Sequence, residues 1–336
     1  TATTWRPWPG ESVTLTLTRP AGVEGRTLTI DSATLELSPG ARASDAVLQV
    51  ELRSSRGAQH AFTLPPGAEL RSASVDGAPL SASLEEGRLV VPIQPGAHAV
   101  SISWREPRGL GPFFRAGRVG LNAAAVNARV HLSMPADRWT LFAGGPRLGP
   151  AVMFWSLLAV FLLVSAGLGR LELTPLGWRQ WFLLSVGLSQ VPVPAAAVVA
   201  GWLVALGWRG KNPRENPRQF DVLQVALAAL TAAALLCLFS SIKRGLLGQP
   251  DMQIGGNGST AALLRWFKDR TANPLPRPWV LSVPLGVYRL AMLGWALWLA
   301  NALLGWLKWG WACYAAGGLW KSSRPPAGEP PPPPKP

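Results

Sequence analysis

The chain has few of the residues that bind metals or attack substrates. It holds two cysteines and three histidines in 336 residues, and only 15% of its residues are charged. Cys237 and Cys313 lie in apolar stretches, where a thiol behaves as a small buried apolar residue. The histidines, His60, His98 and His131, are too far apart in the sequence to match a local metal motif. We therefore expect no metal and no cofactor.

Catalytic signatures are also missing. The chain contains no nucleophile elbow, no zinc-protease helix motif, no phosphate-binding loop and no paired carboxylates in a supporting context. We expect that the protein is not an enzyme. A membrane-embedded transferase would need acids or histidines at a membrane interface, and the only candidates for that role in the chain are Glu172 and Asp269.

Acidic residues become scarce after residue 150. Residues 1–149 hold 15 arginines, no lysine and 12 acids, whereas residues 150–336 hold 17 basic and 6 acidic residues. A basic excess in the loops and tail of an apolar region is typical of membrane proteins that contact lipid headgroups. We expect membrane lipids as partners and no nucleic acid, because the first half shows no basic face with aromatic platforms.

The first 145 residues have the pattern of half-buried strands. Polar and apolar residues alternate in 13–19, 27–37, 46–53 and 98–104, and Asp76-Gly77 is a typical hairpin turn. Short strands with frequent turns predict an antiparallel β-sandwich of about eight strands over 1–145.

Long apolar runs begin at about residue 150 and predict membrane-spanning helices. The runs are 150–169, 179–208, 219–242 and a last one from about residue 285 to residue 314. We therefore expect an α+β membrane protein in which the sandwich is followed by a bundle of about four transmembrane helices over 146–320. The run 179–208 is too long for one straight span and too short for two. A single kinked helix is favoured, with a re-entrant hairpin as the alternative.

Two segments outside these runs have their own signatures. In 259–270, Leu263, Leu264, Trp266 and Phe267 share one side of a helix with charges opposite, which predicts a helix in the headgroup plane. The Pro-rich tail 321–336 predicts disorder.

The orientation follows from the basic loops. With the sandwich in the periplasm, 170–179 and 243–284 would be cytoplasmic, while the basic 209–218 loop would face the periplasm and argue against this arrangement. A re-entrant second segment would move 209–218 to the cytoplasm.

A few polar or helix-breaking residues interrupt the apolar runs, and residues of this kind inside a bilayer are functional candidates. Asp221 and Arg289 begin different runs on opposite membrane faces, so they are not expected to pair. The break at 189–194 exposes carbonyls that can coordinate an ion or substrate. The candidate positions are Gln190, Pro192, Pro194, Asp221, Arg289 and Asn301.

Several motifs resemble the C-terminal part of large uncharacterised bacterial envelope membrane proteins of proteobacterial type with β-sandwich ectodomains. The resemblance implies this architecture, a Gram-negative source and several hundred preceding residues, but no activity. The matching stretches are Leu64–Leu70, Val75–Gly77, Trp104–Pro107, Gly145–Pro150, Val287–Met292 and Gly317–Trp320.

The sequence therefore predicts a non-enzymatic inner-membrane scaffold or binding subunit of a cell-envelope assembly, with other envelope proteins as partners. The alternative is a transporter or channel component that uses the proline-broken second segment.

Overall fold

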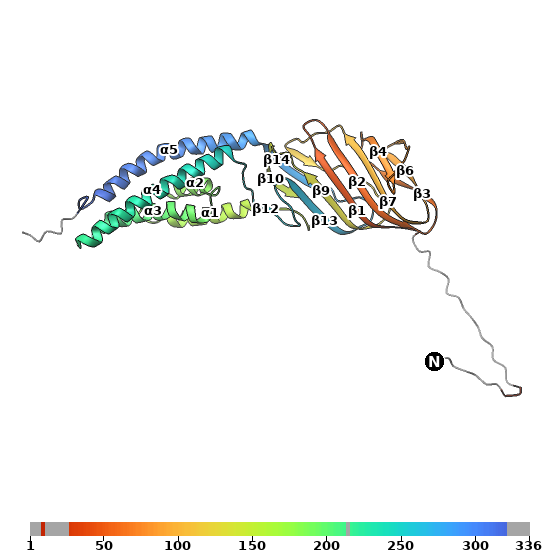
Figure 1. Cartoon of the computed structure of the whole chain (residues 1–336), viewed down its shortest axis with the longest axis horizontal. Coiled ribbons are helices and arrows are strands. Elements are labelled where there is room, and N and C mark those ends of the chain that lie inside the picture. The colour runs from red at the N-terminus through yellow and green to blue at the C-terminus, as the bar shows by residue number, and fades with distance from the viewer. Residues whose placement is uncertain (1–7, 11–26, 213–215, 321–336) are drawn as a thin grey trace, which may run out of the picture.

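The structure is a computed structural model that describes residues 8–10, 27–212 and 216–320. A β domain stands at one end of a bundle of helices, and the bundle extends away from it (Figure 1). The alternating stretch 13–19 and the proline-rich tail 321–336 lie outside the described residues. The predicted class, an N-terminal β-sandwich followed by apolar helices, is confirmed.

The β domain is built on a seven-stranded sheet in the order β13-β9-β1-β2-β7-β4-β5. All neighbours are antiparallel except β1 and β9, which run parallel. The strands of this sheet are β1 (Leu28–Pro39), β2 (Ser44–Ser54), β4 (Glu69–Val75), β5 (Ala78–Pro79), β7 (Gly96–Glu106), β9 (Ala125–Ser133) and β13 (Leu263–Thr271).

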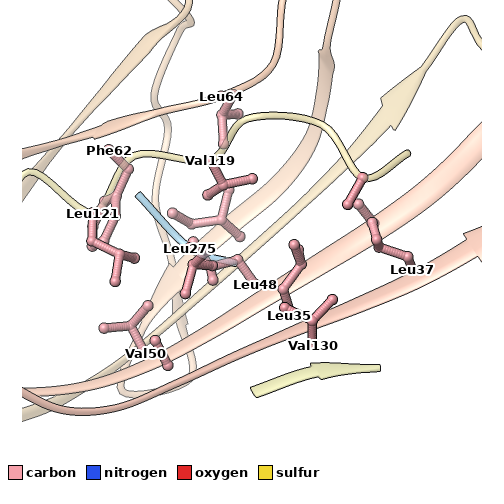
Figure 2. Close-up of a cluster of buried hydrophobic side chains, with 14 of the residues drawn as sticks. Leu35, Leu37, Leu48, Val50, Phe62, Leu64, Val119, Leu121, Val130 and Leu275 are labelled. Atoms are coloured by element: carbon pink, nitrogen blue, oxygen red, sulfur yellow. The ribbon is translucent and has the colours of Figure 1, made fainter. Parts of the chain in front are cut away.

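In the described residues, three smaller sheets complete the β domain. They are the pair β3 (Ala58–Thr63) and β6 (Arg88–Ile93), the sheet of β10 (Arg138–Gly144), β14 (Trp279–Pro284) and β8 (Phe113–Arg115), and the pair β11 (Ala151–Val152) and β12 (Ile254–Gly255). Figure 2 shows side chains of the large sheet, such as Leu35 and Leu48, gathered with Phe62, Val119 and Leu275 in one buried cluster.

The predicted alternation accounts for this core. Along β2, every second side chain is buried, so the apolar residues face inward while the charged ones face solvent. The Asp76-Gly77 turn joins β4 to β5, and both residues have positive φ, as a type I′ turn requires.

The expected interfacial helix at 259–270 is wrong. Residues 263–271 form β13, which pairs antiparallel with β9 along its length. Leu264 and Trp266 are buried in the core of the β domain, while Arg265 between them is exposed. The segment therefore follows the period-two pattern of a strand rather than the pattern of a helix, because pairing with β9 buries every second residue in the sandwich.

The bundle contains five helices in the described residues. They are α1 (Phe154–Leu168), α2 (Trp178–Leu188), α3 (Val193–Lys211), α4 (Pro217–Leu247) and α5 (Leu285–Ala315). Of these, α3, α4 and α5 are long and apolar enough to cross a membrane, and α1 is a shorter apolar helix.

The second apolar run is not the single kinked helix that the sequence favoured but two helices joined by a short turn, which is the hairpin arrangement of the alternative. Pro192 is the N-cap of α3 and Pro194 lies in its first turn, where a missing backbone N–H leaves no hydrogen bond unmade. Ser165 on α1 and Ser185 on α2 are hydrogen-bonded at 3.2 Å, so α1 and α2 pack as a pair.

We call the end of the bundle next to the β domain the proximal end, and the opposite end the distal end. The 169–177 connection is distal, because Glu172 lies 3.8 Å from Lys211 at the end of α3. The 189–192 turn is proximal, because Gln190 contacts Asp251 just before β12. The end of α3 at Lys211, the start of α4 and the C-terminus of α5 are distal in turn, because Arg209 and Gln224 both contact the end of α5.

This path corrects the expected sides and the domain boundary. The segment between α4 and α5 was expected on the membrane face opposite the sandwich, but β12, β13 and β14 are part of the β domain. The β domain is therefore built from 27–152 together with 254–284, rather than from 1–145 alone. The described residues of the basic 209–218 segment, 209–212 and 216–218, lie on the opposite side from the β domain.

Candidate functional site

The break between α2 and α3 was predicted as a site inside the membrane, but it is a turn at the proximal end of the bundle. Gln190 Nε2 donates to Ser189 Oγ at 3.1 Å, and Gln190 Oε1 accepts from the Asp251 backbone N–H at 3.4 Å. This turn therefore joins the bundle to the strand segment of the β domain.

The other predicted residues are spread along the bundle. Asp221 lies near the distal start of α4 and is half-buried, whereas Arg289 is exposed near the proximal start of α5. The two are therefore at opposite ends, as expected, but Arg289 lies on the side of the β domain rather than opposite it. Asn301 is exposed near the middle of α5. The structure brings none of these three together.

Two buried polar side chains that hold the distal end of α5 in place were not among the predicted sites. Arg209 is fully buried, its Nη2 donates to the Ala316 carbonyl at 2.7 Å, and its guanidinium lies 4.5 Å from the Phe220 ring centre. Gln224 is also fully buried, and its Nε2 donates to the Tyr314 carbonyl at 3.0 Å. These groups satisfy carbonyls that have no partner within the helix. Only the polarity of Gln224 within an apolar run signalled this role.

The histidines do not form a site. His60 Nε2 lies 2.7 Å from the Leu121 carbonyl oxygen, and His98 Nδ1 lies 2.7 Å from Asp76 Oδ2. Burial lowers the pKa of His60, whereas the hydrogen bond to Asp76 raises the pKa of His98. Within the described ranges, no three His, Cys, Asp or Glu side chains are grouped so that they could hold a metal ion.

The strongest candidate for a binding surface is a groove of about 770 Å³ on the β domain. Four cationic side chains and one carboxylate are among the described residues that line it, together with aromatic rings. We call it the basic groove and define it by Arg115, Arg147, Lys268, Asp269, Arg277, Phe267 and Trp279.

Distant parts of the chain build the basic groove. Arg115 ends β8, Arg147 lies between β10 and β11, and Lys268 is on β13. The segment of Arg147 is held against β13 because the Phe267 backbone N–H donates to the Leu148 carbonyl at 2.8 Å. Arg277 is fixed by a hydrogen bond from its Nε to the Ala116 carbonyl at 3.2 Å.

The glycines before α1 allow two indole rings to lie against the backbone here. A Cβ on Gly144 would lie 2.6 Å from the Trp279 ring, and one on Gly149 would lie 2.3 Å from the Trp266 ring. Trp279 also stacks on Phe113, which is 58% exposed, with ring centres 5.8 Å apart. The groove thus combines four cationic side chains, of which Arg277 is held by a hydrogen bond, with an accessible aromatic surface.

The cationic side chains of the basic groove outnumber its carboxylates by four to one. Its single carboxylate, Asp269, lies 3.9 Å from Arg270, which is not part of the groove lining. Arg147 and Lys268 are both exposed. An arrangement of this kind attracts anionic groups through the summed field of its cations.

Comparisons with known proteins add little to this geometry. No protein-family model matches the chain, and no curated protein matches it. Similar solved structures include an M1 zinc metallopeptidase from Deinococcus radiodurans at 14% identity, and a mutant of that enzyme bound to a Tyr-Ser-Ala substrate at 13% identity. Each match covers 37% of this chain and 36% of that chain, with a TM-score of 0.28. The chain thus spans about a third of those structures, and a likeness this low carries no functional argument.

Proposed function

We propose that the protein is a non-enzymatic scaffold or binding subunit of a bacterial cell-envelope assembly, anchored in the inner membrane with its β domain in the periplasm. The observation that carries the proposal is the insertion of β12, β13 and β14 between α4 and α5. Because these strands complete the sheets of the β domain, the domain is attached to the bundle at three points along the chain rather than by one linker.

The contacts between the two parts support a rigid attachment. Leu285, the first residue of α5, donates its backbone N–H to the Asp137 carbonyl at 2.8 Å, directly after β14 ends. Trp155 on α1 donates to the Leu141 carbonyl at 2.8 Å and stacks on Phe142. A rigidly held domain presents its surface at a fixed height and orientation above the membrane, which suits a scaffold.

The basic groove is the surface that we assign to partner binding. Clustered cations with adjacent aromatic rings suit a partner with an acidic segment, because charge complementarity directs association and the rings supply contact area. We therefore place an envelope protein with an exposed acidic region at this groove.

The distribution of basic residues supports the proposed orientation. Arg170, Arg179, Arg209, Lys211 and Arg218 lie at the distal end of the bundle, and positively charged loops favour the cytoplasmic side. At the proximal end, the helices carry Lys243, Arg244 and Arg289. Arg209, Lys211 and Arg218 belong to the 209–218 segment that argued against a periplasmic β domain, and at the distal end they support this orientation instead.

No specific observation favours the transporter alternative. That hypothesis needs a broken helix near the membrane midplane, where freed carbonyls can bind a substrate. The break at 189–192 lies instead at the proximal end, where it forms a turn.

The proposal is tested by comparing the proteins that copurify with three forms of the full chain after mild cross-linking in membranes. The groove variant is Arg147→Glu/Lys268→Glu, and the control Arg42→Glu/Arg56→Glu makes the same charge change at exposed arginines outside the groove. We expect the groove variant alone to lose its specific partner. Equal recovery of every protein from both variants would contradict the assignment of the groove.

A further inference from the structure

Asn301 lies within the part of α5 that crosses the membrane. The exposed cations Arg289 and Lys308 bracket a stretch of α5, 290–307, that contains no charged residue. At about 1.5 Å per residue, the distance from Arg289 to Lys308 is roughly 28 Å, close to the ~30 Å thickness of the hydrocarbon core. Asn301 is twelve residues from Arg289 and seven from Lys308. Its amide is therefore well inside the apolar layer.

The amide points away from the bundle. The buried side of α5 includes Met292, Trp295 and Leu299, and at about 100° per residue Asn301 lies on the opposite side. The same outer side carries Leu297 and Leu304, which are 65% and 63% exposed. α5 runs along the outer edge of the bundle (Figure 1).

Nothing in the described part of the chain satisfies this amide. The Asn301 side chain is exposed and makes no hydrogen bond to the residues that the structure describes. A polar group in hydrocarbon has no water to bind, so it is expected to face another protein segment that can pair with it.

We propose that Asn301 is the centre of a contact between the α5 helices of two copies of this chain. An asparagine side chain carries both a donor and an acceptor, so two identical amides related by a two-fold axis satisfy each other without any further residue. Both copies enter the membrane in the same orientation, so this axis runs along the membrane normal and the helices pack in parallel.

The surface around Asn301 permits the helices to approach. Gly294 and Gly305 lie on the same outer side, seven residues before and four residues after Asn301, and a Cβ added at either would meet no atom within 4 Å. Such open glycines allow close packing of helix backbones in a membrane. Lys308 also lies on this side, but its long side chain reaches the headgroups and keeps its charge out of the contact.

The test measures self-association of the full chain in lipid vesicles by energy transfer between donor- and acceptor-labelled copies. We expect wild type to associate, and Asn301→Leu to weaken association about three- to tenfold. Gly294→Leu should abolish it by adding bulk to the contact. Two matched controls change positions elsewhere on the lipid-facing surface: Gly201→Leu on α3, where a Cβ also meets no atom within 4 Å, and Leu236→Ala on α4.

Association of both control variants at the wild-type level, together with the loss in Asn301→Leu and Gly294→Leu, supports the contact. A wild-type chain that stays monomeric at every protein-to-lipid ratio would overturn the proposal and leave Asn301 to a different partner. Unchanged association of Asn301→Leu, or an equal loss in Gly201→Leu, would also overturn it.

Discussion

The β domain and the helix bundle each show a different use of arginine. In the β domain, ion pairs such as Arg53–Asp31 and Arg105–Asp45 lie on exposed strand surfaces, with N–O distances of 2.7 Å. In the bundle, Arg209 is fully buried and donates to a helix carbonyl. Surface pairs contribute little to stability because water already solvates both partners, whereas a buried donor holds a group that has no other partner.

The surrounding solvent decides where polar groups are used. A domain in water can place them on any outer face, and its sequence shows this as a regular alternation. A bundle in lipid has no such face, so we expect its few polar side chains at helix ends, in the interior or at contacts with other chains. Substitutions in the two regions should therefore have different effects.

The largest effect is expected in the β domain, at the strand that lies between the membrane helices in sequence. Trp266 on β13 is 1% exposed, so Trp266→Ala should lower the free energy of unfolding by about 3–5 kcal/mol. Thermal unfolding followed by near-ultraviolet circular dichroism measures the change. Lys268→Ala, on the exposed part of the same strand, serves as the control. A similar small effect for both would mean that this segment is not part of the sandwich.

A smaller effect is expected in the bundle at Gly207. A Cβ at this position would lie 1.6 Å from the Leu173 carbonyl oxygen, so Gly207→Ala must displace backbone and should destabilise by about 1–3 kcal/mol. On the same helix, a Cβ at Gly201 meets nothing within 4 Å, so Gly201→Ala should be neutral or slightly stabilising. Melting temperatures in one detergent compare the two variants. Equal melting temperatures would contradict the close approach of α3 to the 169–177 connection.

Loss of the buried amide of Gln224 should destabilise the distal end of α5. Gln224→Leu leaves the Tyr314 carbonyl without its donor, and we expect a loss of about 1–3 kcal/mol. Hydrogen exchange of the last turn of α5 should increase, while exchange near Leu285 should not change. Val225→Ala, at a neighbouring exposed position, is the control. Protection that falls evenly along α5 would show that Gln224 has no local role.

The smallest effects concern pH and are confined to the β domain. Burial lowers the pKa of His60 below its unfolded value of about 6.5, so its stabilising contribution is present above that pH and is lost as the pH falls through the folded pKa. Asp76 raises the pKa of His98, so its contribution is present below about 6.5 and is lost as the pH rises through the folded pKa.

Proton titration of the two rings by nuclear magnetic resonance checks these directions. His98 should titrate at a higher pH than His60, and Asp76→Asn should bring the two values closer together. The reverse order would contradict the assigned environments.

Much of the β domain was predictable because the alternation of polar and apolar residues follows which side chains of a strand are exposed and which are buried. The stretches 27–37, 46–53 and 98–104 all lie within strands of the large sheet or begin one residue before it. The membership of β13 could not be predicted, because its partner β9 is more than a hundred residues away in sequence and two long helices lie between them. Its four apolar residues also fit one side of a helix, so only the pairing with β9 decides between a helix and a strand.

In the bundle, apolar length predicted where helices lie but not where one run divides. Pro192 and Pro194 suggested a kink inside a span, yet proline is equally suited to the first turn of a new helix. The α2 helix has 11 residues and is about 16 Å long, too short to span a membrane alone, so its position depends on packing against α1. The basic groove could not be predicted, since its cations come from four separate segments.

Chemical labelling of single cysteines tests most directly whether the segment between α4 and α5 belongs to the β domain. In a Cys237→Ala/Cys313→Ala background, cysteines replace Glu69, Asp269 and Glu172, whose side chains are 68%, 77% and 93% exposed. The rate of reaction with a membrane-impermeant maleimide is measured in sealed vesicles of known orientation. We predict that positions 69 and 269 react from the same side and that position 172 reacts from the other. Reaction of position 269 from the side of position 172 would show that the segment between α4 and α5 is not part of the β domain.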